Sequence, residues 1–296
     1  MKITINKILN WAGSLLAIAG IVFVSIRLKE YSSQLDCSRL DVFLWSAMFG
    51  LSLVYCLINI LLALAWQNIL KYFNSDTTKL WAIKIYGLTQ IAKYVPGNIM
   101  HLASRQAMGL SAGIGGWQLA KTSVWEHLIL SVAGISYSIW IIPLFLPIVT
   151  APITIVCFTA IVIIMMLVLN RYMSIEITRA FALHTLFLTV SGMIFVSMLA
   201  LLIKNEPITA SQIFFFFGSF IIAWLAGLLT PGAPAGVGVR EFILLLLLKG
   251  QIQETDLLLA VLLSRVITVT GDLLFFLLAS LITIDKRRSD LTTKKE

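Results

Sequence analysis

Charged side chains are scarce in this chain. Only 12% of its 296 residues are Asp, Glu, Lys or Arg, whereas 59% are hydrophobic. Soluble domains average about 25% charged residues, so this composition excludes an ordinary soluble domain. No charged residue occurs between 128 and 170. One helix over that run would be on the order of 60 Å long, about twice the hydrocarbon core of a bilayer. The run therefore predicts two membrane spans, with Pro143, Pro147 and Pro152 at the turn between them.

Cysteines and enzyme motifs are scarce as well. The three cysteines, Cys37, Cys56 and Cys157, show no CxxC or CxxH spacing, which argues against a disulfide framework and against a metal site. The sequence contains no P-loop, no HExxH and no dinucleotide-binding fingerprint. We therefore expect no enzyme activity, no cofactor and no metal.

The net charge of +8 does not indicate nucleic-acid binding, because the basic residues are scattered over short loops and the end of the chain. The tail 285–296 carries five of them, and the positive-inside rule places such a tail in the cytoplasm. Lys2 and Lys7 precede an apolar run from Ile8 to Ile26 without a small-residue cleavage site. We interpret this run as an uncleaved first span with a cytoplasmic N-terminus.

Six segments are long and apolar enough to cross a bilayer: 8–27, 42–70, 117–146, 152–170, 182–203 and 257–283. Two more apolar regions, 81–109 and 210–249, are each interrupted by a Pro-Gly element. If both termini are cytoplasmic, the number of crossings is even, so each interrupted region must enter and leave on the same side. We therefore predict an all-α integral membrane protein with six full transmembrane helices and two re-entrant helical hairpins.

The order of these segments suggests an inverted repeat within one polytopic membrane domain, 1–296. Each half, 8–146 and 152–283, would run span, span, hairpin, span, with opposite topologies. Inverted repeats with broken helices are typical of transporters. One observation opposes the topology, because the loop 28–41 would lie outside and yet carries Lys29 and Arg39.

The two interruptions share one spacing. Pro96-Gly97 and Pro231-Gly232 are each followed by seven residues and then an arginine, Arg105 or Arg240. Proline and glycine interrupt helices, and an arginine at membrane depth is costly. The repeated pattern therefore predicts a polar site within the membrane that handles a polar molecule.

The second interruption has the features of an anion site. Its helix-breaking residues are Pro231, Gly232, Pro234, Gly236 and Gly238. A helix restarting near Gly238 would direct unpaired N–H groups toward a phosphate, which Arg240 could clamp with two hydrogen bonds. Glu241, together with Glu126 and Asp272, could balance the charge or meet a cationic head group. The alternative is that Arg240 only pairs with Glu241 or Asp272 and fixes the hairpin.

The first interruption resembles the second. Asn98 is a candidate helix cap, and His101 and Arg105 lie four residues apart on one helix face. Lys93 and Arg105 are candidate substrate ligands, although both could instead extend to the cytoplasmic surface. His101 is either a hydrogen-bonded structural residue or a proton carrier.

Three further charged residues fall within predicted spans. Glu126 requires a partner, which Lys93, Arg105 or Arg240 could supply, or else it carries protons. Arg265 and Asp272 share a helix face but are about 10 Å apart along it, too far to pair with each other. Each therefore needs a partner from elsewhere, and the two hairpins are the expected suppliers.

The pattern Pro-x2-Pro-x-Gly-x-Gly-Val-Arg-Glu at 231–241 resembles the signature of the lysylphosphatidylglycerol synthase transmembrane region, or flippase-like domain. The run Lys-Tyr-Val-Pro-Gly-Asn at 93–98 is similar to an earlier element of that family. Glu126 and Arg265 also match family positions, whereas His127 stands where the family commonly has arginine. The resemblance extends over about residues 8–284.

This resemblance implies a bacterial inner-membrane protein that translocates lipids or supports their translocation. In the multiple peptide resistance factor, such a domain is fused to a soluble aminoacyl transferase. No part of residues 1–296 resembles that transferase, so aminoacyl transfer is not expected. The expected substrate is a phospholipid or a lipid-linked sugar. The alternatives are a non-catalytic subunit that partners an enzyme of a lipid or polysaccharide pathway, and an intramembrane enzyme acting on a lipid phosphate.

Overall fold

The fold is helical throughout the described part of the chain. The computed structural model describes residues 41–95, 99–146, 149–203, 208–230, 236 and 238–283. Within these ranges there is no strand, and the only β-type pairing is an isolated bridge between Lys249 and Ile252. The all-α prediction is therefore confirmed. The predicted first span 8–27 and the basic tail 285–296 lie outside the described residues.

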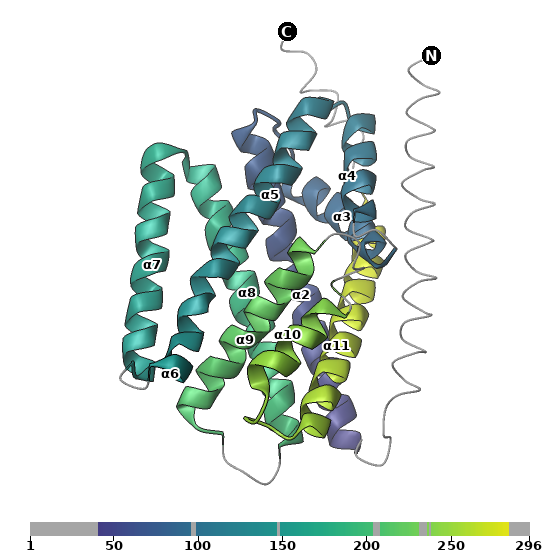
Figure 1. The fold of residues 1–296 in the computed structure, drawn as a ribbon. Coiled ribbons are helices and arrows are strands. Elements are labelled where there is room, and N and C mark those ends of the chain that lie inside the picture. The colour runs from purple at the N-terminus through teal and green to yellow at the C-terminus, as the bar shows by residue number, and fades with distance from the viewer. Residues whose placement is uncertain are drawn as a thin grey trace.

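The described elements follow one another with short connections (Figure 1). They are α2 (Val42–Tyr72), α3 (Lys79–Gln90), η2 (Ile91–Tyr94), α4 (Met100–Ser111), α5 (Gly116–Ser136), η3 (Tyr137–Ile141), α6 (Ile142–Phe145), α7 (Ala151–Tyr172), α8 (Ile175–Leu202), α9 (Ala210–Leu229), α10 (Val239–Leu248) and α11 (Glu254–Leu281).

Six segments of the described chain are long and apolar enough to cross a membrane: Val42–Tyr72, Gly116–Ile141, Ala151–Tyr172, Ile175–Leu202, Ala210–Leu229 and Asp256–Leu281. Five of them match predicted spans. The sixth, α9, belongs to the region 210–249 that we predicted to be a hairpin. At 20 residues α9 is about 30 Å long and could cross a bilayer by itself, whereas α10, with 10 residues, is about half that length.

Local sequence signals explain where several helices begin and end. Polar side chains accept hydrogen bonds from the first-turn N–H groups of α2, α3, α8 and α9, and these N-caps are Asp41, Thr78, Ser174 and Thr209. After α4 the chain turns at Gly113, which has a φ of +88°. That left-handed conformation is cheap for glycine and ends a helix.

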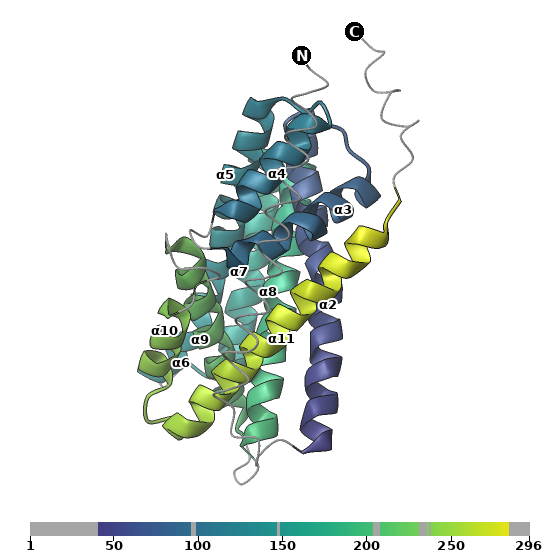
Figure 2. The same ribbon diagram turned by 90° about the vertical axis from the view of Figure 1, so that its right-hand side faces the viewer.

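The interrupted regions occupy opposite ends of the bundle (Figures 1 and 2). α3 and α4 lie toward the end where α2 finishes and α5 begins, whereas α9 and α10 lie toward the other end and pack against each other. The long helix α11 contacts α3 and η2 as well as α10, so it connects the two regions. α7 lies at the edge of the bundle, and among its described side chains only Thr154 is buried.

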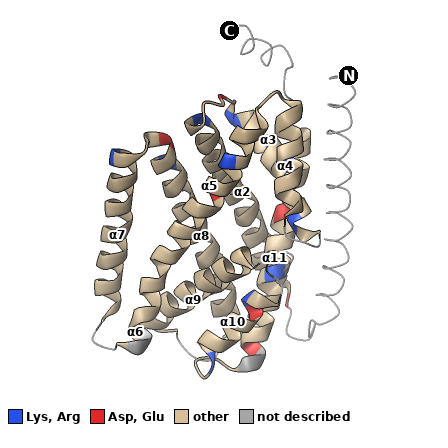
Figure 3. Cartoon of the chain, turned by 45° about the horizontal axis from the view of Figure 1, so that its top comes forward, with Lys and Arg blue, Asp and Glu red and all other residues tan. Residues whose placement is uncertain are grey.

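Charged residues are sparse along the helices (Figure 3). Most of the described basic residues that lie outside the interior are near the end shared by α3 and α4. They are Lys71 in the last turn of α2, Lys79 and Lys84 in α3, Lys121 in α5, Arg171 at the end of α7 and Arg179 in α8. Lys249, directly after α10, is a described basic residue at the opposite end.

The second interruption brings two backbone segments into contact. A Cβ built on Gly227 of α9 would lie 3.0 Å from the Cα of Gly236, and one built on Gly236 would lie 2.7 Å from the Cα of Gly227. Gly236 also has a φ of +71°. The site therefore requires glycine for two independent reasons, one steric and one conformational.

We expect Gly236→Ala to lower the free energy of unfolding by at least about 2 kcal/mol. The cost of a left-handed backbone at alanine and the cost of the overlap between its Cβ and backbone atoms add together. Gly250→Ala is the matched control. Gly250 has a φ of +76°, but a Cβ there meets no described atom within 4 Å. The free energy of unfolding of Gly250→Ala should therefore fall by only about 1–2 kcal/mol. Denaturant unfolding in detergent micelles measures both values, and equal losses would show that the Gly227 contact is unimportant.

Candidate functional site: a charged cavity between the two interrupted regions

One cavity is bordered by residues from both interrupted regions. Its empty volume is about 730 Å³, part of which is open to the surroundings. η2 and α4 contribute Lys93, His101 and Arg105, α10 contributes Arg240, and α11 contributes Arg265. Although Arg105 and Arg240 are 135 positions apart in the sequence, the fold brings both to one space. Small-molecule sites commonly combine apolar walls with a few polar groups, as this cavity does.

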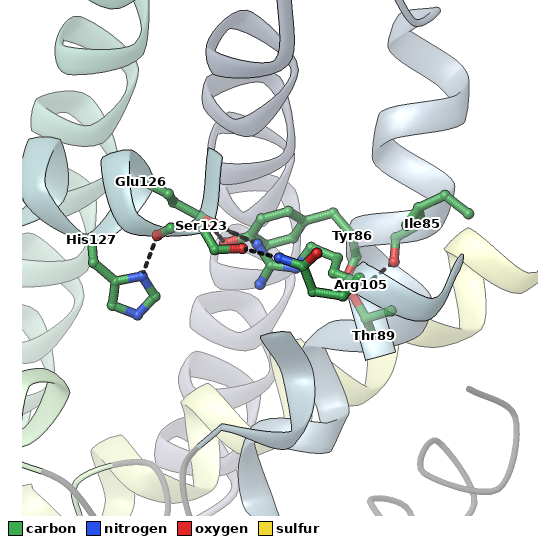
Figure 4. Close-up of polar contacts among 8 residues, drawn as sticks. Ile85, Tyr86, Thr89, Arg105, Ser123, Glu126 and His127 are labelled. Carbon is green, nitrogen blue, oxygen red and sulfur yellow. Dashed lines mark hydrogen bonds and ion pairs between the residues drawn. The ribbon is translucent and has the colours of Figure 1, made fainter. Parts of the chain in front are cut away.

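The first ion pair of the cavity joins α4 to α5. The Nη1 of Arg105 donates to both carboxylate oxygens of Glu126, at 2.9 and 2.7 Å, and the hydroxyl of Tyr86 donates to the same carboxylate at 2.9 Å. Figure 4 shows Arg105 and Glu126 pointing toward each other, with Tyr86 beside them. The guanidinium also lies 3.9 Å from the centroid of the Tyr86 ring. The predicted need of Glu126 for a basic partner is confirmed.

The second ion pair joins η2 to α11. The Nζ of Lys93 lies 2.7 Å from Oδ2 of Asp272, which has no exposed surface. The hydroxyl of Tyr94 donates to the same oxygen at 2.6 Å, and the side-chain amide of Asn59 donates to Oδ1 at 3.3 Å. Three donors thus compensate a carboxylate that would otherwise be very costly to bury.

The third ion pair joins α11 to α10. Arg265 donates through Nε to Oε1 of Glu241 at 2.8 Å, its Nη2 lies 2.7 Å from that oxygen, and Nη2 also donates to the carbonyl of Gly236 at 3.1 Å. The other oxygen of Glu241 accepts the N–H of Gly238 at 2.7 Å. The prediction that the two interrupted regions supply the partners of Arg265 and Asp272 is confirmed for both.

Arg240 differs from the other three cations. The Nε of its half-buried side chain is enclosed and has no hydrogen-bond partner among the described residues. No described carboxylate lies within ion-pair distance of the guanidinium, whose Cζ lies 5.8 Å from the centroid of the Trp224 ring. Glu241 and Asp272, which we considered as partners, are paired with Arg265 and Lys93 instead. The alternative that Arg240 only fixes the hairpin through an ion pair is therefore wrong within the described structure.

The charges of this site do not cancel. Lys93, Arg105 and Arg265 are matched one to one by carboxylates, which leaves the charge of Arg240 in excess. The residues of the interruptions that lie outside the described structure, 96–98, 231–235 and 237, are all uncharged in the sequence. They cannot alter this balance, so the four cations that line the cavity and the three carboxylates paired with them together carry one net positive charge.

The predicted site residues are largely brought together. Lys93, Arg105, Glu126, Arg240 and Arg265 line the cavity, whereas Glu241 and Asp272 pair with residues that line it. Asn98 and the breaks Pro96, Gly97, Pro231, Gly232 and Pro234 lie outside the described residues. Gly236 and Gly238 are described, and both have positive φ.

Gln90 and Tyr94, two polar residues of the first interruption, also line the cavity, whereas sequence reasoning missed Tyr55, Tyr86 and Trp224. In an apolar helix such side chains are indistinguishable from packing residues. Tyr94 had one signal, its position directly after Lys93, and both residues contact Asp272.

The sequence contains one match to an enzyme motif. Residues 109–113 read Gly-Leu-Ser-Ala-Gly, which matches the GxSxG pattern of serine hydrolases. That pattern works only on a sharp turn between a strand and a helix, whereas Ser111 is the last residue of α4. Its hydroxyl donates to the carbonyl of Met108 at 2.8 Å, as is common in helices. The match therefore gives no support to hydrolase chemistry.

Comparison with known proteins adds no family to this description. Neither a scan against protein-family models nor a search of curated proteins finds a match to the chain.

Proposed function

We propose that this protein moves an anionic lipid, either a phospholipid or a lipid-linked sugar, across the membrane by holding its phosphate in the cavity beside Arg240. The observation that carries the proposal is the excess positive charge at Arg240, the one cation of the site without a carboxylate among the described residues. An arginine fork free of carboxylates fits a phosphate with two parallel hydrogen bonds.

The cavity walls suit a molecule that is part polar and part apolar. Leu62, Leu130, Phe187 and Leu228 line the same space as the charged groups. A head group would lie among the ion pairs, while its tails would remain on the apolar side toward the bilayer. A small soluble anion has no apolar surface that could pack against these walls.

The distribution of basic residues supports one orientation in the membrane. Cytoplasmic loops are enriched in Lys and Arg. Most of the described basic residues outside the interior lie near the end shared by α3 and α4. We propose that this end faces the cytoplasm of a bacterial inner membrane. The predicted cytoplasmic tail 285–296 agrees, because α11 runs toward that same end (Figure 2).

In this orientation the two interrupted regions would be re-entrant hairpins. α3 and α4 would enter from the cytoplasm, and α9 and α10 from the opposite side, although the length of α9 by itself also allows a full span. An inverted repeat of this kind would let one half rock against the other around the cavity. The resemblance to the flippase-like domain family agrees with this proposal, which rests on the cavity and its charge.

A translocation assay tests the proposal directly. The purified protein is reconstituted into vesicles that contain fluorescent lipids, and a membrane-impermeant quencher reports how much lipid changes leaflet. Relative to protein-free vesicles, we expect the protein to accelerate the exchange of lipids with an anionic phosphodiester head group more than that of an uncharged glycosyl diacylglycerol, which has a polar head but no phosphate. Equal accelerations of the charged and uncharged lipids would contradict the phosphate site. A covalently altered lipid would instead favour the intramembrane enzyme.

A further inference from the structure

All three histidines of this chain belong to one neighbourhood. His101 and His127 line the cavity, and His184 interacts electrostatically with Glu126 and His127 across the contact between α5 and α8. Glu126 and His184 lie ten and nine residues after the starts of their helices, and both helices start at the same end of the bundle. At about 1.5 Å per residue the two side chains therefore lie at a similar depth.

His184 is unusual because it is buried without partners. Its ring has no exposed surface, and neither ring nitrogen has a hydrogen-bond partner among the described residues. A buried polar group without a hydrogen bond is costly, so such a group calls for an explanation. A purely structural position of this kind would be filled more favourably by Leu or Phe.

The geometry of His127 fixes which of its nitrogens can accept a proton. Nδ1 lies 2.9 Å from the carbonyl oxygen of Ser123 (Figure 4). A carbonyl only accepts hydrogen bonds, so Nδ1 must carry the hydrogen and Nε2 must hold the lone pair. Because His127 lines the cavity, a proton arriving there could bind to Nε2.

The charged and ionisable groups around this pair are few. His184 interacts with Glu126 and His127, both on α5. Glu126 faces Arg105 of α4 and Tyr86 of α3, and His101 of α4 interacts with His127 and Arg105. From α2, α7, α9 and α11, which also pack against α8, no described ionisable group is found to interact with His184. Metal binding is not indicated, since no three His, Cys, Asp or Glu side chains of the described residues are grouped closely enough to hold an ion.

We propose that His127 and His184 form a proton-binding site that is linked to the anion site at Arg240. A proton bound by this pair raises the net charge of the cavity from one to two. The new charge also lies beside Glu126 and competes with Arg105 for that carboxylate, so Arg105 becomes a second cation available to the anion. Protonation therefore strengthens anion binding, and by linkage anion binding promotes proton uptake. This inference rests on the proposed function and names the proton as the coupled ion.

The test uses the full-length protein in detergent and dihexanoyl phosphatidylglycerol as the probe. A phosphodiester keeps one charge over this range of pH, so any pH dependence belongs to the protein. We expect the Kd to fall at least about tenfold between pH 8 and pH 5.5, the range in which histidine titrates. Calorimetry in buffers of different ionisation enthalpy should show at least about half a proton taken up per lipid bound near pH 6.5, the uptake to which a tenfold change in Kd corresponds.

The double variant His127→Gln with His184→Gln should abolish both the pH dependence and the proton uptake. His127→Gln alone serves if the double variant does not fold, because His127 is only half-buried. Glu176→Gln is the matched control, since it removes a half-buried ionisable group from the first turn of α8, the helix that carries His184. It should retain both effects.

A ligand-free measurement separates this inference from the proposed function. Histidine ¹⁵N NMR reports directly whether the two rings gain a proton as the pH is lowered. If neither ring is protonated above pH 5, or if the wild type binds the probe with no proton uptake, the proton site is overturned. If the probe binds at no pH although a ring does titrate, the anion site of the proposed function fails and the linkage fails with it.

Discussion

Replacing Arg240 with alanine is expected to slow lipid translocation roughly 10- to 100-fold, because a hydrogen bond to a charged group contributes about 1.5–3 kcal/mol and each 1.4 kcal/mol is a factor of ten. The same change should leave the unfolding midpoint of the protein unchanged or slightly higher. Arg240 has no hydrogen bond or ion pair among the described residues, and its removal leaves all three ion pairs of the site intact. Loss of transport without loss of stability identifies a binding residue.

Two further variants sharpen this measurement. Arg240→Lys keeps the charge but not the planar fork, so its translocation rate should lie between those of the wild type and Arg240→Ala. Lys249→Ala also removes one cation, directly after the same helix α10, but from an exposed position. It should translocate lipid at the wild-type rate. If Arg240→Ala is as active as Lys249→Ala, the phosphate does not bind at Arg240.

The sequence predicted which charged residues form the site better than it predicted which of them form ion pairs with one another. The cost of burying a charge required partners for Glu126, Arg265 and Asp272, and each has one. The choice of partner depends on how α10, η2 and α11 approach one another, and no local pattern encodes that approach. For this reason the sequence left Arg240 as a candidate partner for both Glu241 and Asp272, although neither pairs with it in the structure.

The prediction of the fold shows the same limit. Apolar runs predicted the spans at 42–70 and 152–170 closely, since length and hydrophobicity alone decide them. The region 210–249 was harder, because its first part, α9, satisfies the criteria for a span even though the Pro-Gly interruption follows it. The sequence did not identify His184 as part of the site. A single histidine in an apolar run does not reveal that it interacts with Glu126 and His127 of α5.

Asp272→Ala is expected to cost about 3–5 kcal/mol in the free energy of unfolding, the usual penalty for removing one partner of a buried ion pair. Lys93, whose side chain is 16% exposed, would lose its counter-ion, and the hydroxyl of Tyr94 would lose its acceptor. The loss of charge can be separated from the loss of hydrogen bonds. Asp272→Asn keeps a side-chain oxygen for Tyr94 and should cost less.

Combining Asp272→Asn with Lys93→Met should restore much of the stability, because it removes both charges together and leaves neither ion buried alone. Asp76→Asn is the matched control in the exposed turn between α2 and α3, and it should change the stability by no more than about 0.5 kcal/mol. Denaturant unfolding in micelles gives all four values. If Asp272→Ala behaves like Asp76→Asn, the ion pair does not hold η2 against α11. If the double variant is no more stable than Asp272→Asn alone, the buried charge of Lys93 is not the source of the cost.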